Sequence, residues 1–243
     1  MGSPIDLKNC SIFVRDGYSN AGAVNHSGGY ALGDTTMVVD GITGIIPLWS
    51  RFTVAGETGS PVHTVTAHSE TTGNTTSLTF TPALAGSVAD NAVITFTYNE
   101  IELVVGEGNL TFTEKKAREY KLNKGRLYSV RNGDEAPVEL NFSFYWEFLK
   151  SSVTEGEQPT LEEALKQEGQ CSGWVTTDTV NPCAPYAVDI VIRNNPPCTN
   201  IDNEEVQFKY FRYEELSHNA KDATVECKGS CNLTSPIKVR GAS

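Results

Sequence analysis

Short apolar or alternating runs, separated by clusters of Gly, Asn, Asp and Pro, recur along most of this 243-residue chain. Runs of this kind, rich in Val, Ile, Thr and aromatic residues, are typical of β-strands bounded by turns. The first covers residues 10–15 and is closed by Asp16 and Gly17, and long runs near the end cover residues 186–193 and 206–213. The pattern therefore predicts a mainly β fold.

The composition changes after the first run. Residues 17–29 are rich in Gly, Ser and Asn, which predicts a linker or a long loop. From residue 30 to residue 98, 15 of 69 residues are Thr and none is Lys, and branched Thr and Val side chains suit a pleated sheet. We predict a small inserted β domain at residues 30–98, within a main domain of residues 1–29 and 99–243. A single continuous domain with long hairpins is the alternative.

Two local patterns in the main domain are strong. Residues 138–148 alternate over a long strand, with Leu140 and Phe144 on the face that we expect to be buried. Only one helix is predicted, at residues 160–167, because Thr160 can cap it and Glu163 stands at the capping-box position.

Three further features concern turns and loops. Asn132-Gly133 predicts a hairpin turn, because both residues tolerate positive φ. The charged segment 114–119 interrupts two expected strands, and we interpret it as a hairpin end or a protruding loop. His218 follows a turn-like Leu-Ser pair and is interpreted as a turn residue.

The net charge of −11 argues against a protein that grips nucleic acid, since such binding depends on basic patches that neutralise phosphate. An acidic surface repels phosphate, so it suits a lining along which nucleic acid slides. The sequence shows no secretory signal and no apolar run of membrane-spanning length, so we expect no membrane partner.

The sequence contains no phosphate loop, nucleophile elbow, zinc-protease motif or EF-hand loop, so we predict no enzyme, cofactor or metal site. Cys227 and Cys231 are one residue too far apart for the usual zinc knuckle, and we interpret them as buried thiols. A disulfide between Cys183 and Cys198 is the open alternative. Aromatic clusters at 142–148 and 208–213 are interpreted as core and subunit interface, with a carbohydrate platform as the alternative.

The segment from residue 99 to residue 240 resembles the tail tube proteins of long-tailed bacteriophages. The resemblance rests on the order of elements and on several phrases. These are residues 107–116 (EGNLTFTEKK), residues 142–148 (FSFYWEF) before the single helix, and residues 211–232, similar to the closing strand pair.

The segment from residue 33 to residue 96 resembles a β module that recurs in phage structural proteins. Its matching phrases are residues 33–41 (GDTTMVVDG), 51–56 (RFTVAG) and 79–84 (TFTPAL). A module inserted at this point departs from a minimal tube subunit.

The resemblance implies a tail-tube-like β-sandwich or half-barrel with one flanking helix, plus the inserted module on the outer surface. Six copies would join sheets edge to edge into a ring, and rings would stack into a tube that conducts genomic DNA during ejection. The implied partners are further copies, a tape measure protein and a tail terminator protein. The chain would belong to the virion tail, assembled in the host cytoplasm, with no specific DNA binding.

Two groups of residues are candidates for these roles. Acidic residues on or beside long strands are candidates for the lumen: Glu139, Glu147, Asp189, Glu204 and Glu205. Residues of the charged segment are candidates for the contact between rings: Glu114, Lys115, Lys116, Arg118 and Glu119.

Two other functions remain open from the sequence. One is another virion component, such as a head decoration protein, which would share the β module and the acidic charge. The other is a carbohydrate-binding or adhesin-like module, suggested by the aromatic clusters and the Thr-rich strands.

Overall fold

The computed structural model describes residues 10–44, 46–71, 75–103, 110–145, 159–180, 183–194 and 204–240. Strands account for 55% and helical residues for 5%, so the predicted mainly β class is confirmed. The predicted helix is present, and it is the single α-helix within those ranges.

The chain divides into two compact units. The unit that we call the sheet unit consists of Met1–Val14, Glu102–Phe148 and Asn181–Ser243. The unit that we call the barrel unit consists of Arg15–Ile101 and Leu149–Val180.

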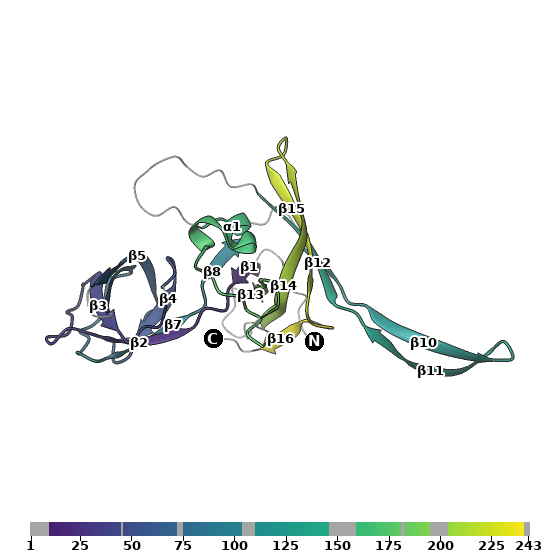
Figure 1. Cartoon of the computed structure of the whole chain (residues 1–243), viewed down its shortest axis with the longest axis horizontal. Coiled ribbons are helices and arrows are strands. Elements are labelled where there is room, and N and C mark those ends of the chain that lie inside the picture. The colour runs from purple at the N-terminus through teal and green to yellow at the C-terminus, as the bar shows by residue number, and fades with distance from the viewer. Residues whose placement is uncertain are drawn as a thin grey trace. The chain divides into compact units, whose positions relative to one another are not determined.

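Six short strands of the barrel unit close into a barrel, drawn in purple to blue in Figure 1. They are β2 (Asn20–Val24), β3 (Thr36–Asp40), β4 (Arg51–Val54), β5 (His63–Thr71), β6 (Thr75–Thr81) and β7 (Val93–Thr97). Their order around the barrel is β2-β3-β6-β5-β4-β7. Alternate side chains of each strand point inward, and they form a core that includes Met37, Val39, Phe52, Leu78, Phe80, Ile94 and Phe96.

Strand β2 lies within residues 17–29, so the predicted linker was wrong over Asn20–Val24. Val24 is fully buried in the barrel core. A Cβ at Gly22 would lie 2.6 Å from the carbonyl oxygen of Asp40 on the neighbouring strand. The small residue thus permits close strand packing. The inserted domain at residues 30–98 and its outward placement stay predictions.

The helix α1 (Leu161–Lys166) also belongs to the barrel unit, followed by a short 3-10 turn, η2 (Gly169–Cys171). The predicted capping box is confirmed: the Glu163 amide donates to Thr160 Oγ1 at 3.2 Å, and the Thr160 amide donates to Glu163 Oε2 at 3.0 Å. Leu161, Ala164 and Leu165 form the buried side of the helix. The helix ends at Gln167, which adopts a left-handed conformation with φ of 58°.

The main element of the sheet unit is an eight-stranded sheet. Seven of its strands follow the order β8-β1-β13-β14-β15-β12-β9, and β16 pairs with the beginning of β14. The strands are β1 (Cys10–Arg15), β8 (Glu100–Leu103), β9 (Thr111–Thr113), β12 (Val138–Tyr145), β13 (Val188–Asn194), β14 (Glu204–Asn219), β15 (Thr224–Cys231) and β16 (Ile237–Arg240).

The alternation predicted for the long strand is confirmed in β12. Val138, Leu140, Phe142 and Phe144 are buried, while Glu139 and the other intervening residues are exposed or half-buried. Its neighbour β15 alternates in the same way and is paired with β12 over its full length. The sheet therefore has one core face and one polar face here.

Strands β10 (Lys116–Asn123) and β11 (Arg126–Glu135) form a separate two-stranded hairpin, which we call the arm (Figure 1). Lys124 and Gly125 make its turn, with φ of 52° and 79°. Two consecutive residues with positive φ match the twist of a hairpin.

Three predictions about turns were wrong. Asn132 and Gly133 lie inside β11 and not in a turn. A Cβ at Gly133 would be 3.0 Å from the Ala117 Cβ, so glycine at this position allows the two strands to approach closely. Segment 114–119 is not the hairpin end, because Lys116 begins β10 at the base of the arm. His218 lies in β14 opposite Val225.

Candidate assembly surface

The arm carries an apolar face that the sequence analysis did not identify. Tyr120 is paired with Val130, and Leu122 is paired with Leu127. Opposed residues share a face of an antiparallel pair, as do residues two apart on one strand. A shift in register at Leu122 leaves Tyr128 as an extra residue, so Leu127 and Val130 share a face although they are three positions apart. We call Tyr120, Leu122, Leu127 and Val130 the apolar arm face.

These four side chains are between 54% and 69% exposed, and Tyr128 is 76% exposed. Within the described residues, β10 and β11 pair only with each other. The opposite face is charged and includes a 3.1 Å ion pair between Glu119 and Arg131. An isolated two-stranded hairpin is marginally stable in water. The arm therefore has the features of a surface that becomes covered in an assembly.

The predicted ring-contact residues lie at the base of the arm and are partly engaged within the chain. Lys115 forms an ion pair with Glu139, and Arg118 donates to Asn132 across the hairpin. Glu119 is the partner of Arg131. The structure thus brings one ring-contact candidate, Lys115, together with one lumen candidate, Glu139.

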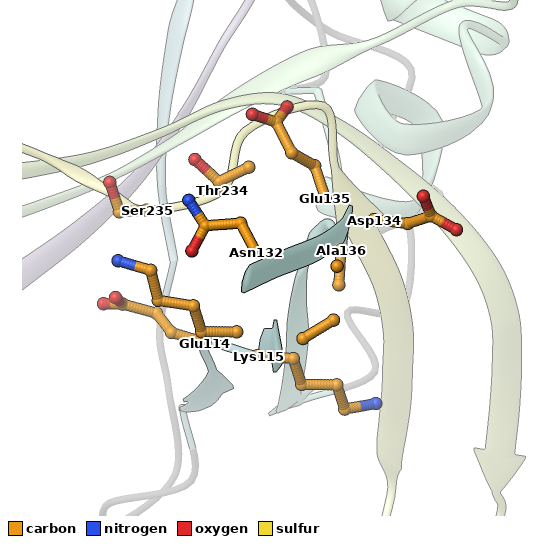
Figure 2. Close-up of a pocket in the computed structure, with 11 residues that line it drawn as sticks. Glu114, Lys115, Asn132, Asp134, Glu135, Ala136, Thr234 and Ser235 are labelled. Atoms are coloured by element: carbon orange, nitrogen blue, oxygen red, sulfur yellow. The ribbon is translucent and has the colours of Figure 1, made fainter. Parts of the chain in front are cut away.

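A pocket of about 530 Å³ lies at the base of the arm (Figure 2). Its walls come from the start of β10, the end of β11 and the segment before β16, and include Glu114, Lys116, Asn132, Asp134, Glu135, Thr234 and Ser235. Figure 2 shows the carboxylates of Glu114, Asp134 and Glu135 at separate points around the pocket. Within the described residues, no three His, Cys, Asp or Glu side chains are placed to hold a metal ion.

The predicted lumen residues do not form one cluster. Glu139 is exposed on the polar face of β12, where Ser230 and Thr113 lie opposite it. Glu147 lies outside the described residues. Glu204 is half-buried at the start of β14.

Two of the predicted lumen residues have structural contacts instead. The Tyr210 amide donates to Asp189 Oδ1 at 2.9 Å, where the register between β13 and β14 shifts. Glu205 is only 6% exposed and forms a 3.3 Å ion pair with Arg193. Gln207 also donates to the Glu205 carboxylate, at 2.9 Å. Burial and pairing make Glu205 unsuited to lining a channel, so this prediction is corrected.

The polar face of β12 continues onto β15, which the sequence analysis missed. Glu226 lies opposite Ser143, and Lys228 lies opposite Asn141. Glu226 therefore shares a face with Glu139. The alternation of residues 224–231 was the signal that would have revealed this.

Four rings of the two aromatic clusters lie in the core. Phe142 and Phe144 are buried, as are Phe208 and Phe211, with ring centroids of Phe142 and Phe211 5.8 Å apart. Tyr145 and Tyr213 of the same clusters are 49% and 37% exposed, and Trp146 and Phe148 lie outside the described residues, so the carbohydrate platform stays an open alternative.

The cysteine interpretation is confirmed for the described thiols of β15. Cys227 and Cys231 are buried free thiols, and burial raises the pKa of each to about 12. Cys198 lies outside the described residues, so the disulfide with Cys183 stays a prediction. Thiols with such raised pKa values are not nucleophiles near neutral pH.

Two buried polar groups hold the barrel unit together. Asp16 accepts hydrogen bonds from four N–H groups: the amides of Tyr18 (3.2 Å), Asn99 (2.6 Å) and Val175 (3.2 Å), and Asn99 Nδ2 (2.6 Å). Burial raises the pKa of Asp16 to about 6, although these donors act in the opposite direction. Asp16 thus joins three distant parts of the chain.

The second group is a pair inside the barrel. His63 Nε2 lies 2.8 Å from Glu57 Oε2, and His63 Nδ1 lies 2.8 Å from the carbonyl oxygen of Pro82. Because a carbonyl only accepts, Nδ1 carries a proton. Glu57 Oε1 also accepts from the Ala85 amide at 2.7 Å. Both side chains are fully buried, so the pair has a structural role.

Comparison with models of known protein families, with curated proteins and with solved structures finds no match to this chain. Within the described residues, no helix is long and apolar enough to span a membrane.

Proposed function

We propose that this chain is the structural subunit of a bacteriophage tail tube and self-assembles into stacked six-membered rings. The observation that carries the proposal is the apolar arm face, which is exposed on a hairpin that pairs with no other described strand. Burial of such side chains contributes roughly 1–2 kcal/mol each. Four of them, repeated in every copy, contribute favourably to the free energy of assembly.

The open sheet supports the joining of copies into rings. The order of its described strands ends at β9, a strand of three residues that covers β12 only from Glu139 to Asn141. An open sheet edge is a template for pairing with another chain. A ring of copies joined in this way has a closed sheet and no exposed edge.

The charge balance supports a lumen through which DNA moves. The net charge is −11, and the polar face of β12 and β15 places Glu139 and Glu226 on one surface. On this face Glu139 pairs with Lys115 and Lys228 pairs with Glu215, so Glu226 supplies the excess negative charge. In the proposed tube this face lines the lumen, repels phosphate and lets DNA pass without specific binding. The further partners in this proposal are a tape measure and a tail terminator protein, with assembly in the host cytoplasm.

Electron microscopy of the purified full chain tests the proposal. We expect hollow rings or tubes of one diameter. A chain that stays monomeric when concentrated, or that forms solid filaments, contradicts the proposal. Closed particles without tubes would favour another virion component, such as a head decoration protein.

A double variant tests the role of the arm. Leu122→Ser with Leu127→Ser changes only exposed side chains, so we expect the free energy of unfolding of the monomer to change by about 0.5 kcal/mol or less. We expect assembly to be lost. Leu32→Ser is the matched control, because Leu32 is 70% exposed in the barrel unit. Equal assembly of the double variant and this control would show that the arm face is not an interface.

A further inference from the structure

We infer that the pocket at the base of the arm receives the tip of the arm of a second copy of this chain. This inference rests on the proposed function and names the two surfaces that meet when rings stack.

The tip of the arm is strongly basic. Lys121, Lys124 and Arg126 lie within six residues at the turn, and residues 120–130 contain no acidic residue. All three side chains are exposed. The ion pairs of the arm and its base join Glu119 to Arg131 and Lys115 to Glu139. None of the three basic side chains of the tip has a carboxylate partner among the described residues.

The pocket has the complementary charge. Glu114, Asp134 and Glu135 line it, and none of them is in an ion pair within the described ranges. Lys115 is engaged by Glu139, which leaves Lys116 as the one basic residue of the lining that is not paired. The carboxylates stand apart around the pocket (Figure 2). Since no three such side chains among the described residues are placed to hold a metal ion, cationic side chains are the occupants that suit this pocket.

Geometry requires that the occupant come from another copy. The strand β10 has eight residues, and at about 3.3 Å per residue its two ends are roughly 23 Å apart. The pocket lies at one end of this strand and the basic turn at the other, so a tip cannot reach the pocket of its own arm. The pocket volume of about 530 Å³ is that of a site for a few side chains, not for a domain.

A tip-to-base contact has a consequence for assembly. It joins two different surfaces of neighbouring copies. A contact of this kind adds one copy after another and forms an open assembly, unless the rotation between copies closes the assembly into a ring. Successive layers therefore add in one direction. The charges set the register between layers, while the apolar arm face supplies most of the affinity.

Charge reversal tests the inference in the full chain. The tip variant is K124E with R126E, and the pocket variant is D134K with E135K. Each alone should assemble at least tenfold less than the wild type, measured by light scattering and electron microscopy, because like charges meet. An equimolar mixture should assemble again, since each reversed tip then meets a reversed pocket. K238E, an exposed reversal on β16, is the control and should assemble like the wild type.

The mixture separates a lost contact from a misfolded variant, because misfolded chains do not restore each other. If the wild type forms tubes and the tip variant stacks equally well, the inference is overturned and the proposed function is not affected. A mixture that fails although both variants unfold cooperatively would also overturn it. Photo-crosslinks from position 124 to residues 132–136 of a second copy, without any tube, would support the pocket and contradict the proposed function.

Discussion

Glu57 and His63 are the single residues on which the barrel core depends most directly. His63 lies between the rings of Phe52 and Phe80, with centroid distances of 5.2 and 5.0 Å. Removing one partner of a fully buried His–carboxyl pair costs about 3–5 kcal/mol. We expect His63→Ala to lower the free energy of unfolding by that amount, because it leaves the Glu57 carboxylate buried and opens a cavity.

Glu57→Gln is the matched variant. The amide NH₂ of Gln can donate to Nε2 of a neutral His63, and its oxygen can accept from the Ala85 amide. We therefore expect a smaller loss, roughly 1–2 kcal/mol, in urea unfolding experiments. Equal losses in the two variants would mean that charge, and not hydrogen bonding, determines the stability of the pair.

Asp16 gives the barrel unit a dependence on pH. Burial raises the pKa of Asp16 from 3.8 to about 6, so between these values the folded chain binds more protons than the unfolded chain. The contribution of Asp16 to stability is therefore complete below about pH 4 and is lost as the pH rises through about 6. The full loss amounts to roughly 3 kcal/mol.

Urea unfolding of the wild type and of Asp16→Asn across this pH range measures the effect. Asn cannot accept from all four donors, so the variant should be less stable at low pH. The informative quantity is the slope: the free energy of unfolding should fall with pH more steeply in the wild type than in the variant. The opposite order of slopes would show that the four N–H donors outweigh burial.

At the scale of elements, the sequence predicted the strongly patterned strands and missed β2 and β16. The burial of alternate residues in β12 follows directly from the alternation in its sequence. The capping box of α1 involves two residues that are close in the sequence. Both features were therefore predictable. Strand β2 (NAGAV) lacks such a pattern, and strand β16 (IKVR) alternates over four residues only. Their pairing depends on partners that are distant in the sequence.

The arm shows why the candidate site was only partly predictable. The charged residues at its base were identified, but their partners Glu139, Asn132 and Arg131 depend on the register of the hairpin. The apolar arm face depends on the extra residue Tyr128, which changes the alternation of β11. Simple period-two reasoning assigns Leu127 and Val130 to opposite faces.

The cap of α1 provides a prediction at this scale. A six-residue helix has few internal hydrogen bonds, so it depends on its cap and on its buried side. We expect Thr160→Ala to lower the free energy of unfolding by about 1 kcal/mol, since the Glu163 amide loses its acceptor. Thr160→Ser keeps the hydroxyl and should be close to the wild type in thermal unfolding. An Ala variant as stable as the Ser variant would mean that packing of Leu161 and Leu165 alone holds the helix.

At the scale of the whole molecule, charge is distributed unevenly between two regions. The tip of the arm is basic, whereas the polar face of β12 and β15 carries Glu139 and Glu226 with Lys228 between them. Lys228 forms a 3.3 Å ion pair with Glu215 of β14, so it is partly neutralised. In the proposed tube, the first region meets another copy and the second meets DNA.

The proposed lining role of this polar face leads to a test with DNA. Each Glu→Lys reversal replaces a negative charge by a positive one, and in a ring these changes repeat around the lumen. We expect assembled particles of Glu139→Lys with Glu226→Lys to retain short duplex DNA at low salt, and to release it as the salt concentration rises. Wild-type particles should not retain it.

The control reverses two exposed carboxylates on elements other than β12 and β15, Glu102→Lys on β8 with Glu168→Lys next to η2. Both double variants gain the same net charge, so a difference between them reflects position and not total charge. Electrophoretic mobility of the DNA, measured over a series of salt concentrations, gives both the affinity and its salt dependence. Because closely spaced positive charges in a narrow channel release more counterions on binding, the lining variant should show the steeper slope. Equal slopes would place Glu139 and Glu226 on a surface that DNA does not pass.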